Sequence, residues 1–185
     1  MNVELAYGQG HISVELPGDR TTVISPAPVA GLPDERAAAL AALDHPTGSP
    51  PLRERVKPGD RICITFTDAT RATPNHRLIP WLLDYLRFVP KENIILVNQT
   101  GTHRPGSRAE LERLLTPAVV AAYRVLNNEP ENPGTFVPLG TLRDGTPALI
   151  NRHVVEADLR IVTGFIEPHF FAGFSGGVKG IIPGA

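Results

Sequence analysis

Hydrophobic residues are spaced along this chain in short runs that alternate between strand-like and helical patterns. Three runs are almost continuous in apolar and β-branched residues, as is typical of strands buried on both faces of a sheet. They are RICITFT (61–67), NIILVNQ (93–99) and LRIVTGF (159–165). Between the first two, five apolar residues at helical spacing predict a helix over about 75–88. They are Leu78, Ile79, Leu82, Leu83 and Leu86.

Further elements fill the rest of the chain. PDERAAALAALDH (33–45) begins with proline and acidic residues and is rich in alanine, which predicts a helix. In SRAELERLL (107–115), Ser107 and Glu110 have the spacing of a capping box at a helix start. Later strand candidates are YRVLNN, TFVPLG and PALINR. Alternating buried strands and helices predict a Rossmann-like α/β fold, with a mostly parallel sheet flanked by helices.

The first residues follow a different pattern. In VELAYGQGHISVELPGDRTTVISP (3–26), apolar positions alternate with polar ones and are interrupted by glycine and proline. This pattern predicts a small antiparallel β unit at the N-terminus.

Composition narrows the class of protein. The 185 residues fit one domain, with 42% hydrophobic and 20% charged residues. A net charge of −1 gives no electrostatic reason to expect nucleic acid or an anionic membrane as a partner. The single cysteine, Cys63, lies in an apolar run and is expected in the core. With neither a signal-peptide pattern nor a membrane-length apolar run, we expect a soluble, cytoplasmic protein.

Polar clusters follow each of the three core strands directly. They are DATRATP (68–74), GTHRPGS (101–107) and EPHFFAGFSGGVKG (167–180). Because parallel α/β sheets bind ligands at the carboxyl ends of their strands, the three clusters are expected to meet in one site.

The last cluster is a glycine-rich loop around Lys179. Its sequence departs from a P-loop, since Val178 precedes the lysine and Gly180 follows it. A tight loop with a solvated lysine fits these residues. A lysine that binds an anion or attaches covalently to an electrophile fits them as well, because apolar neighbours would favour its deprotonated form. Those neighbours are Phe174, Val178, Ile181 and Ile182.

Two histidines and an arginine are predicted at the same edge. His103 and His169 could exchange roles as acid and base, which suits racemisation or epimerisation, or they could bind a metal, although their separation matches no ligand motif. Asp68 and Arg71 could form a local ion pair, or Arg71 could hold a carboxylate in two parallel hydrogen bonds. Thr70 or Thr73 could cap the helix that Pro74 begins.

Taken together, the segments YGQGHISVELP, DATRATP, GTHR and EPHFFAGFSGGVKGIIPG resemble the lactate racemase family, whose members use a nickel-pincer nucleotide. The resemblance implies that Lys179 is joined to this cofactor through a thioamide, with Gly176 and Gly177 beside it. It also implies that His103 and His169 are the catalytic acid and base. Asp68 and Arg71 would be the substrate-binding residues, with Arg71 on the carboxylate or hydroxy-acid end and Asp68 orienting this part of the site. The family's nickel-ligating histidine lies beyond Ala185, so no metal ligand is assigned.

The resemblance further implies a racemase or epimerase of a 2-hydroxy acid, lactate or a related substrate, that works by hydride transfer to and from the cofactor. Residues 1–185 would then be a single domain, the N-terminal cofactor and catalytic domain of a longer two-domain enzyme that depends on cofactor-maturation proteins. This leaves open whether the chain is active by itself. Two alternatives remain, a non-catalytic ligand-binding domain of the same fold and a metal-free enzyme that forms a Schiff base through its lysine.

Overall fold

The computed structural model describes residues 1–185 and divides them into two compact units, Met1–Pro33 and Asp34–Ala185. In the first unit, β1 (Asn2–Tyr7) and β2 (Gly10–Glu15) form an antiparallel pair. The strands are joined by a two-residue turn in which Gly8 has a φ of 59°, a conformation that glycine adopts readily. The predicted N-terminal antiparallel unit is confirmed.

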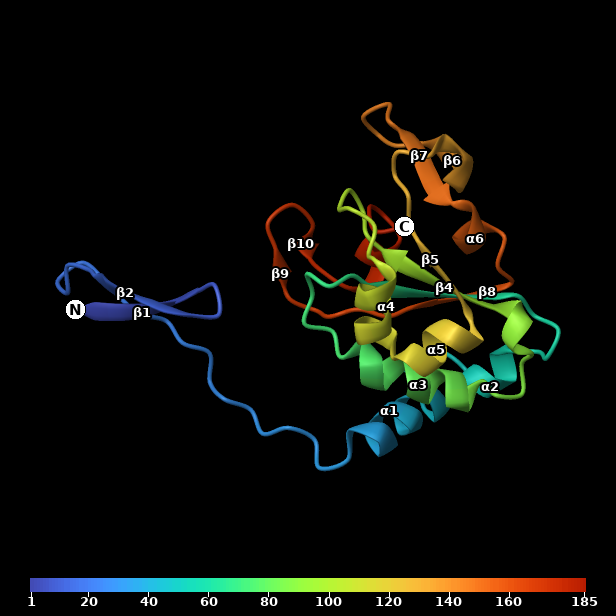
Figure 1. The fold of residues 1–185 in the computed structure, drawn as a ribbon, viewed down its shortest axis with the longest axis horizontal. Coiled ribbons are helices and arrows are strands. Elements are labelled where there is room, and N and C mark those ends of the chain that lie inside the picture. Colours follow the sequence, from blue (N-terminus) through green and yellow to red (C-terminus); the bar gives the residue numbers. More distant parts are fainter. The chain divides into compact units, whose positions relative to one another are not determined.

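The second unit is built on a four-stranded sheet in the order β5-β4-β3-β8, with all neighbours parallel (Figure 1). Its strands are β3 (Ile62–Thr67), β4 (Ile94–Gln99), β5 (Arg124–Asn127) and β8 (Leu159–Val162). The three strands predicted from the continuous apolar runs are therefore neighbours in one parallel sheet. The predicted α/β fold class is confirmed.

β8 ends at Val162, three residues before the predicted strand end. Close packing beyond the strand explains the early end. A Cβ atom on Gly164 would lie 3.0 Å from the Cα of Gly176, so the chain here runs against the glycine-rich loop instead of continuing along the sheet.

Alternating side chains of β3 supply two cores, one on each face of the sheet. Ile62, Ile64 and Phe66 are fully buried on the face that the first five helices cover. Cys63 is buried on the opposite face with Val97. Burial also raises the pKa of the Cys63 thiol to about 12, as expected for a core cysteine.

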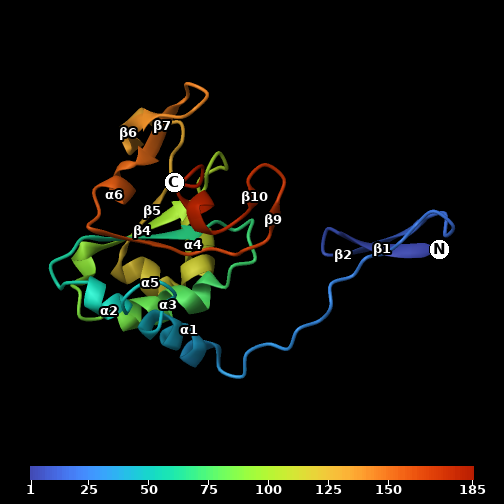
Figure 2. The same ribbon diagram turned by 180° about the vertical axis from the view of Figure 1, so that it is seen from behind.

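Helices α1 to α5 lie together on one side of the sheet (Figures 1 and 2). They are α1 (Glu35–Asp44), α2 (Leu52–Arg55), α3 (Asn75–Tyr85), α4 (Arg108–Leu115) and α5 (Pro117–Ala122). The predicted capping box is present at α4, where Ser107 Oγ accepts a bond from the Glu110 amide and the Glu110 carboxylate accepts one from the Ser107 amide.

The predicted threonine cap of α3 is wrong. Pro74 occupies the N-cap position, and no side chain caps the helix. Thr70 bonds to Asp68 instead, and the buried hydroxyl of Thr73 has no hydrogen-bond partner. Both threonines precede the N-cap position, too early in the chain to serve the first turn.

Shorter elements cover the other face of the sheet. β6 (Phe136–Thr141) and β7 (Pro147–Asn151) form an antiparallel pair, and α6 (Arg152–Val155) follows. Two later strand candidates therefore lie outside the parallel sheet, while the third is β5, at its edge. None of the helices has the length and apolar character that crossing a membrane requires.

Replacement of Ile64 tests the sheet core. Ile64 is fully buried in the middle of β3, so Ile64→Ala should lower the free energy of unfolding by about 2–5 kcal/mol. Urea titration followed by circular dichroism measures the change. The control is Leu139→Ala, at a position that is 59% exposed on β6, which should change stability by less than about 0.5 kcal/mol. Equal effects of the two substitutions would contradict this assignment of the core.

Candidate active site

The segments that follow β3, β4 and β8 line one pocket of about 600 Å³ at the carboxyl edge of the sheet. Its walls include Asp68, Arg71, His103, His169 and Lys179. The structure thus brings together residues that are more than 100 positions apart in the sequence. Gly176 also lines this pocket, whereas Gly177 is outside its lining.

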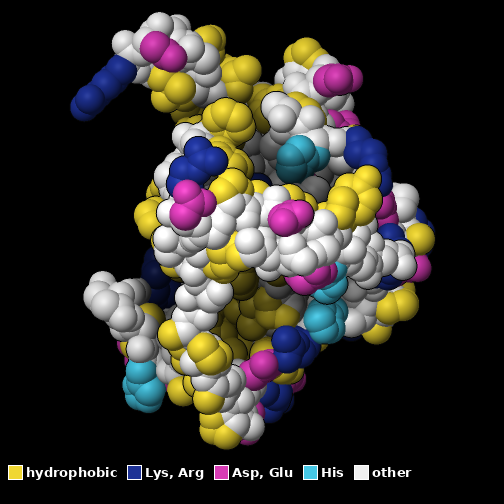
Figure 3. Space-filling model, turned by 90° about the vertical axis from the view of Figure 1, so that its left-hand side faces the viewer, with side chains coloured by type: hydrophobic (Ala, Val, Ile, Leu, Met, Phe, Trp, Pro, Cys, Tyr) yellow, Lys and Arg dark blue, Asp and Glu magenta, His cyan; other side chains and the backbone are white.

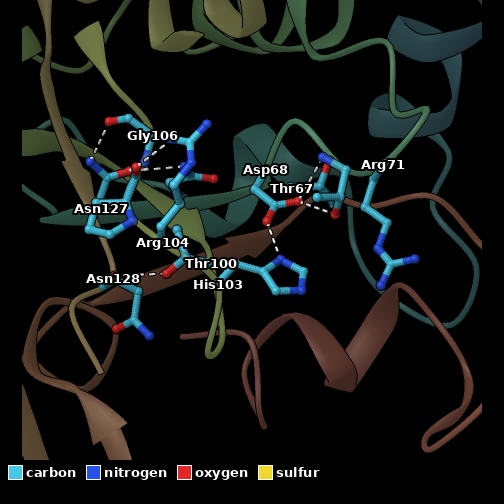
Figure 4. Close-up of polar contacts among 12 residues, drawn as sticks. Thr67, Asp68, Arg71, Thr100, His103, Arg104, Gly106, Asn127 and Asn128 are labelled. Atoms are coloured by element: carbon cyan, nitrogen blue, oxygen red, sulfur yellow. Dashed lines mark hydrogen bonds and ion pairs between the residues drawn. The ribbon is translucent and has the colours of Figure 1, made fainter. Parts of the chain in front are cut away.

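Asp68 and His103 form the shortest polar contact between two side chains of the pocket. Oδ2 of Asp68 lies 2.6 Å from Nδ1 of His103 (Figure 4). Oδ1 of Asp68 accepts bonds from the amide of Thr70 at 3.0 Å and from its hydroxyl at 2.6 Å. Burial opposes ionisation of Asp68, but the bonds from Thr70 and His103 outweigh it and lower the pKa of the carboxyl. An ionised Asp68 requires that Nδ1 of His103 carries a proton.

Arg71 forms its ion pair with a distant residue. Its Nη1 lies 3.1 Å from Oε1 of Glu167, and in Figure 4 its side chain extends away from Asp68. The local Asp68–Arg71 pair, one of two alternatives from the sequence, is therefore not formed. The other guanidinium nitrogens of Arg71 have no partner within the chain, so they remain available to a bound anion.

Glu167 is a site residue that the sequence pattern did not single out. It lies two positions before His169, and Ser175 holds this segment by accepting a bond from the Glu167 amide at 3.2 Å. The Ser175 amide in turn donates to the Glu167 carbonyl at 2.9 Å. A serine in a glycine-rich loop carries no sequence signal for this role, because the bond depends on how the loop folds back.

His169 lies at the end of β9 (Pro168–His169), which pairs antiparallel with β10 (Gly173–Phe174). Its Nδ1 accepts bonds from the backbone amides of Phe171 and Ala172, both at 3.2 Å. Desolvation, together with the positive charges of Lys179 and Arg71, lowers the pKa of His169, while Glu167 acts in the opposite direction.

Lys179 lies in a short 3-10 turn, Gly177–Gly180, and is partly buried. Its ammonium group has no hydrogen-bond or ion-pair partner within the chain. The expectation that apolar neighbours shield it is wrong for three of the four, since Val178 is 88% exposed, Phe174 64% and Ile182 49%. These side chains face outward because the turn presents its backbone to the sheet.

The glycines of this loop serve different purposes. Gly176 has a φ of 74° and Gly177 a φ of 51°, which allows the chain to turn before the lysine. A Cβ atom on Gly180 would lie 2.6 Å from Cγ1 of Val162 and 2.8 Å from Nε2 of Gln99. The absence of a side chain at Gly180 therefore allows the loop to pack directly against the sheet.

Metal ligands were not assigned from the sequence. No group of three or more His, Cys, Asp or Glu side chains is placed to hold a metal ion. The ionisable side chains of the pocket are instead a histidine–aspartate pair, an arginine–glutamate pair, a second histidine and a lysine.

The fold and pocket define the class of this protein, an α/β domain whose parallel sheet carries two histidines, an arginine and a lysine at its carboxyl edge. The family described as lactate racemase N-terminal domain matches residues 7–185, and the chain belongs to this family.

Two curated relatives are lactate racemases. The enzyme of Thermoanaerobacterium thermosaccharolyticum is 34% identical over 99% of this chain and 44% of its own length. That of Lactiplantibacillus plantarum is 38% identical over 81% of this chain and 36% of its own length. The chain therefore spans less than half the length of the relatives it matches.

Solved structures agree with this grouping. The lactate racemase apoprotein of Thermoanaerobacterium thermosaccharolyticum matches all of this chain and 43% of its own, with a TM-score of 0.83 and 34% identity. A protein from Thermotoga maritima matches 84% of this chain and 39% of its own, with a TM-score of 0.67 and 26% identity.

Removal of the Asp68 charge should change how stability depends on pH. The pKa of Asp68 is lower in the folded state than the ordinary value of 3.8, so its ionised form stabilises the fold above that value. This contribution is lost as the pH falls through the lower folded-state pKa. Asp68→Asn should therefore be less stable than the original protein near neutral pH, and the difference should shrink in acid.

Urea titrations between neutral and acidic pH measure this difference. Glu92→Gln, at an exposed position that makes no ion pair, is the control and should leave the profile unchanged. A stability difference for Asp68→Asn that stays constant with pH would contradict the role given to the carboxylate.

Proposed function

We propose that this chain is the N-terminal cofactor and catalytic domain of a racemase or epimerase that acts on a 2-hydroxy acid, either lactate or a related substrate. The observation that carries the proposal is the convergence of Asp68, Arg71, His103, His169 and Lys179 on one pocket. Two relatives named lactate racemase support it. Because the chain spans under half of their length, the activity belongs to the proposed longer enzyme.

The pocket fits the nickel-pincer nucleotide in size and in chemistry. A volume of about 600 Å³ is within the usual range for cofactor sites. Lys179 has an amine without a partner in the chain, and Gly176 lines the same wall without a side chain. Lys179 would hold the cofactor through a thioamide, with Gly176 and Gly177 beside it. When bound, this group supplies a hydride acceptor and donor at its pyridinium ring.

Residues of this chain would handle the proton of the substrate hydroxyl. His103 and His169 line the same pocket from separate loops and would serve as the catalytic acid and base. Asp68 keeps the His103 ring oriented through the 2.6 Å contact and stabilises it when it becomes an imidazolium. Return of the hydride to the opposite face of the keto acid would invert the configuration at Cα, and the other histidine would return the proton to the oxygen.

Arg71 would bind the carboxylate of the hydroxy acid. Glu167 occupies only Nη1 of Arg71 and holds the side chain at the pocket wall. The remaining guanidinium donors could then form two parallel bonds to a carboxylate.

Replacement of Lys179 tests the covalent attachment. In the full-length enzyme, produced together with cofactor-maturation proteins, Lys179→Ala should abolish racemisation and retention of the cofactor mass. Lys179→Arg should fail as well, because arginine keeps the charge but cannot form a thioamide. The control is Lys57→Ala, outside the pocket. Intact-mass spectrometry and a racemisation assay measure both properties, and full activity with an unmodified Lys179 would disprove the attachment.

Replacement of Arg71 tests carboxylate binding. Arg71→Lys keeps the charge but loses one charge-assisted bond, worth about 1.5–3 kcal/mol, so the KM for the hydroxy acid should rise by about ten- to 150-fold. Arg108→Lys, at an exposed ion pair with Glu112, should leave KM unchanged. Steady-state kinetics measure the effect, and an unchanged KM for Arg71→Lys would contradict this role.

A further inference from the structure

The two histidines of the pocket are held through the same ring nitrogen but by partners of opposite kind. Nδ1 of His103 faces an acceptor, the Asp68 carboxylate at 2.6 Å. Nδ1 of His169 faces two donors, the backbone amides of Phe171 and Ala172 at 3.2 Å. An amide N–H always donates, and an ionised carboxylate only accepts.

These partners determine the position of the proton on each ring. Asp68 requires a proton on Nδ1 of His103, so the neutral ring keeps its lone pair on Nε2. The two amides require a lone pair on Nδ1 of His169, so the neutral ring carries its proton on Nε2. The rings are therefore opposite tautomers.

We propose that the two histidines are not interchangeable in this conformation: His103 accepts a proton at Nε2, whereas His169 is a neutral hydrogen-bond donor at Nε2 until the turn 170–172 releases its Nδ1. This inference rests on the proposed function, since it divides the work between the two histidines of that site. It makes the backbone of the β9–β10 turn the positioning element for His169.

The proton balance explains why the turn must open. When His103 takes the substrate hydroxyl proton, the O–H bond breaks, an N–H bond forms at Nε2 and the electron pair stays on the substrate oxygen. If His169 gave its Nε2 proton to an alkoxide with Nδ1 still bound to the two amides, it would become an imidazolate, which is far too basic to form at neutral pH. His169 can give up that proton only when Nδ1 takes up another from water, and the two amides occupy Nδ1.

The two rings face charges of opposite sign. Lys179 and Arg71 disfavour a second proton on His169, and Glu167 only partly offsets them. The charged group that contacts His103 is the carboxylate of Asp68.

The turn is built so that it can open. Gly173 has a φ of 74°, and Phe170 and Phe171 are almost fully exposed, at 104% and 97%. Hydrophobic side chains are visible at the surface among charged ones (Figure 3). Because neither phenylalanine ring is buried, release of Nδ1 breaks the two bonds from the backbone amides to the imidazole and little packing.

Nitrogen NMR of the chain with 15N-labelled histidine tests the proposal without cofactor or substrate. Two-bond 15N–1H spectra, assigned with His103→Gln and His169→Gln, should show a pyrrole-type Nδ1 in His103. For His169 they should show a pyridine-type Nδ1 and a pyrrole-type Nε2 once the ring is neutral. Identical tautomers in the two rings, or a pyrrole-type Nδ1 in His169, would overturn the inference.

A backbone variant supplies the second measurement. Ala172→Pro removes one of the two N–H donors, so the protonation of His169 should shift to higher pH and its Nδ1-protonated form should increase. Phe170→Ala leaves both N–H donors in place and removes only a fully exposed ring, so its spectrum should match that of the original chain. If both variants leave the His169 signals unchanged, the amides do not set the tautomer. Should Ala172→Pro fail to fold, the spectrum of the original chain alone decides.

The NMR result and the proposed function fail separately. A full-length enzyme that racemises with both histidines in the same tautomer would overturn this inference and leave the proposed function intact. Opposite tautomers in a loaded enzyme that converts no hydroxy acid would support the inference about the rings and overturn the proposed function.

Discussion

Parallel pairing of β3 with both β4 and β8 is the constraint on which the site depends. Because the three strands run in the same direction, each delivers the segment that follows it to the same edge of the sheet. Asp68, His103 and the loop of Lys179 meet for this reason. A strand reversed in this sheet would carry its polar cluster to the opposite edge and leave the pocket without one wall.

Within the pocket, each of the two acidic side chains is paired with one basic side chain. Asp68 is bound to His103, and Glu167 to Arg71, so each acid has a partner from a different loop. Lys179 is left without an acid, and His169 is held by neutral amides. This distribution leaves one amine and one neutral imidazole available in the pocket. Such groups suit the binding of an electrophilic ligand that carries an anionic group.

The tautomers link the site to its loop conformation. A turn that donates two backbone N–H groups to one histidine makes the protonation of that ring depend on the turn being closed. Relatives named lactate racemase share the fold of this chain, with a TM-score of 0.83 for the solved apoprotein. The proposed interconversion of two enantiomers requires that the difference between the two histidines be reversible, and an exposed turn with little packing would allow this.

The sequence by itself determined the class of the fold, because strands buried on both faces need continuous apolar runs and such runs are rare elsewhere in a chain. It also determined which segments border the site, since each polar cluster directly follows a core strand. The sequence did not determine which side chains and amides form hydrogen bonds with one another inside the site. Arg71 pairs with Glu167 instead of Asp68, and Ser175 and the amides of Phe171 and Ala172 hold the last loop. These choices depend on how loops separated by up to 100 residues fold back on one another, and no local spacing encodes that path.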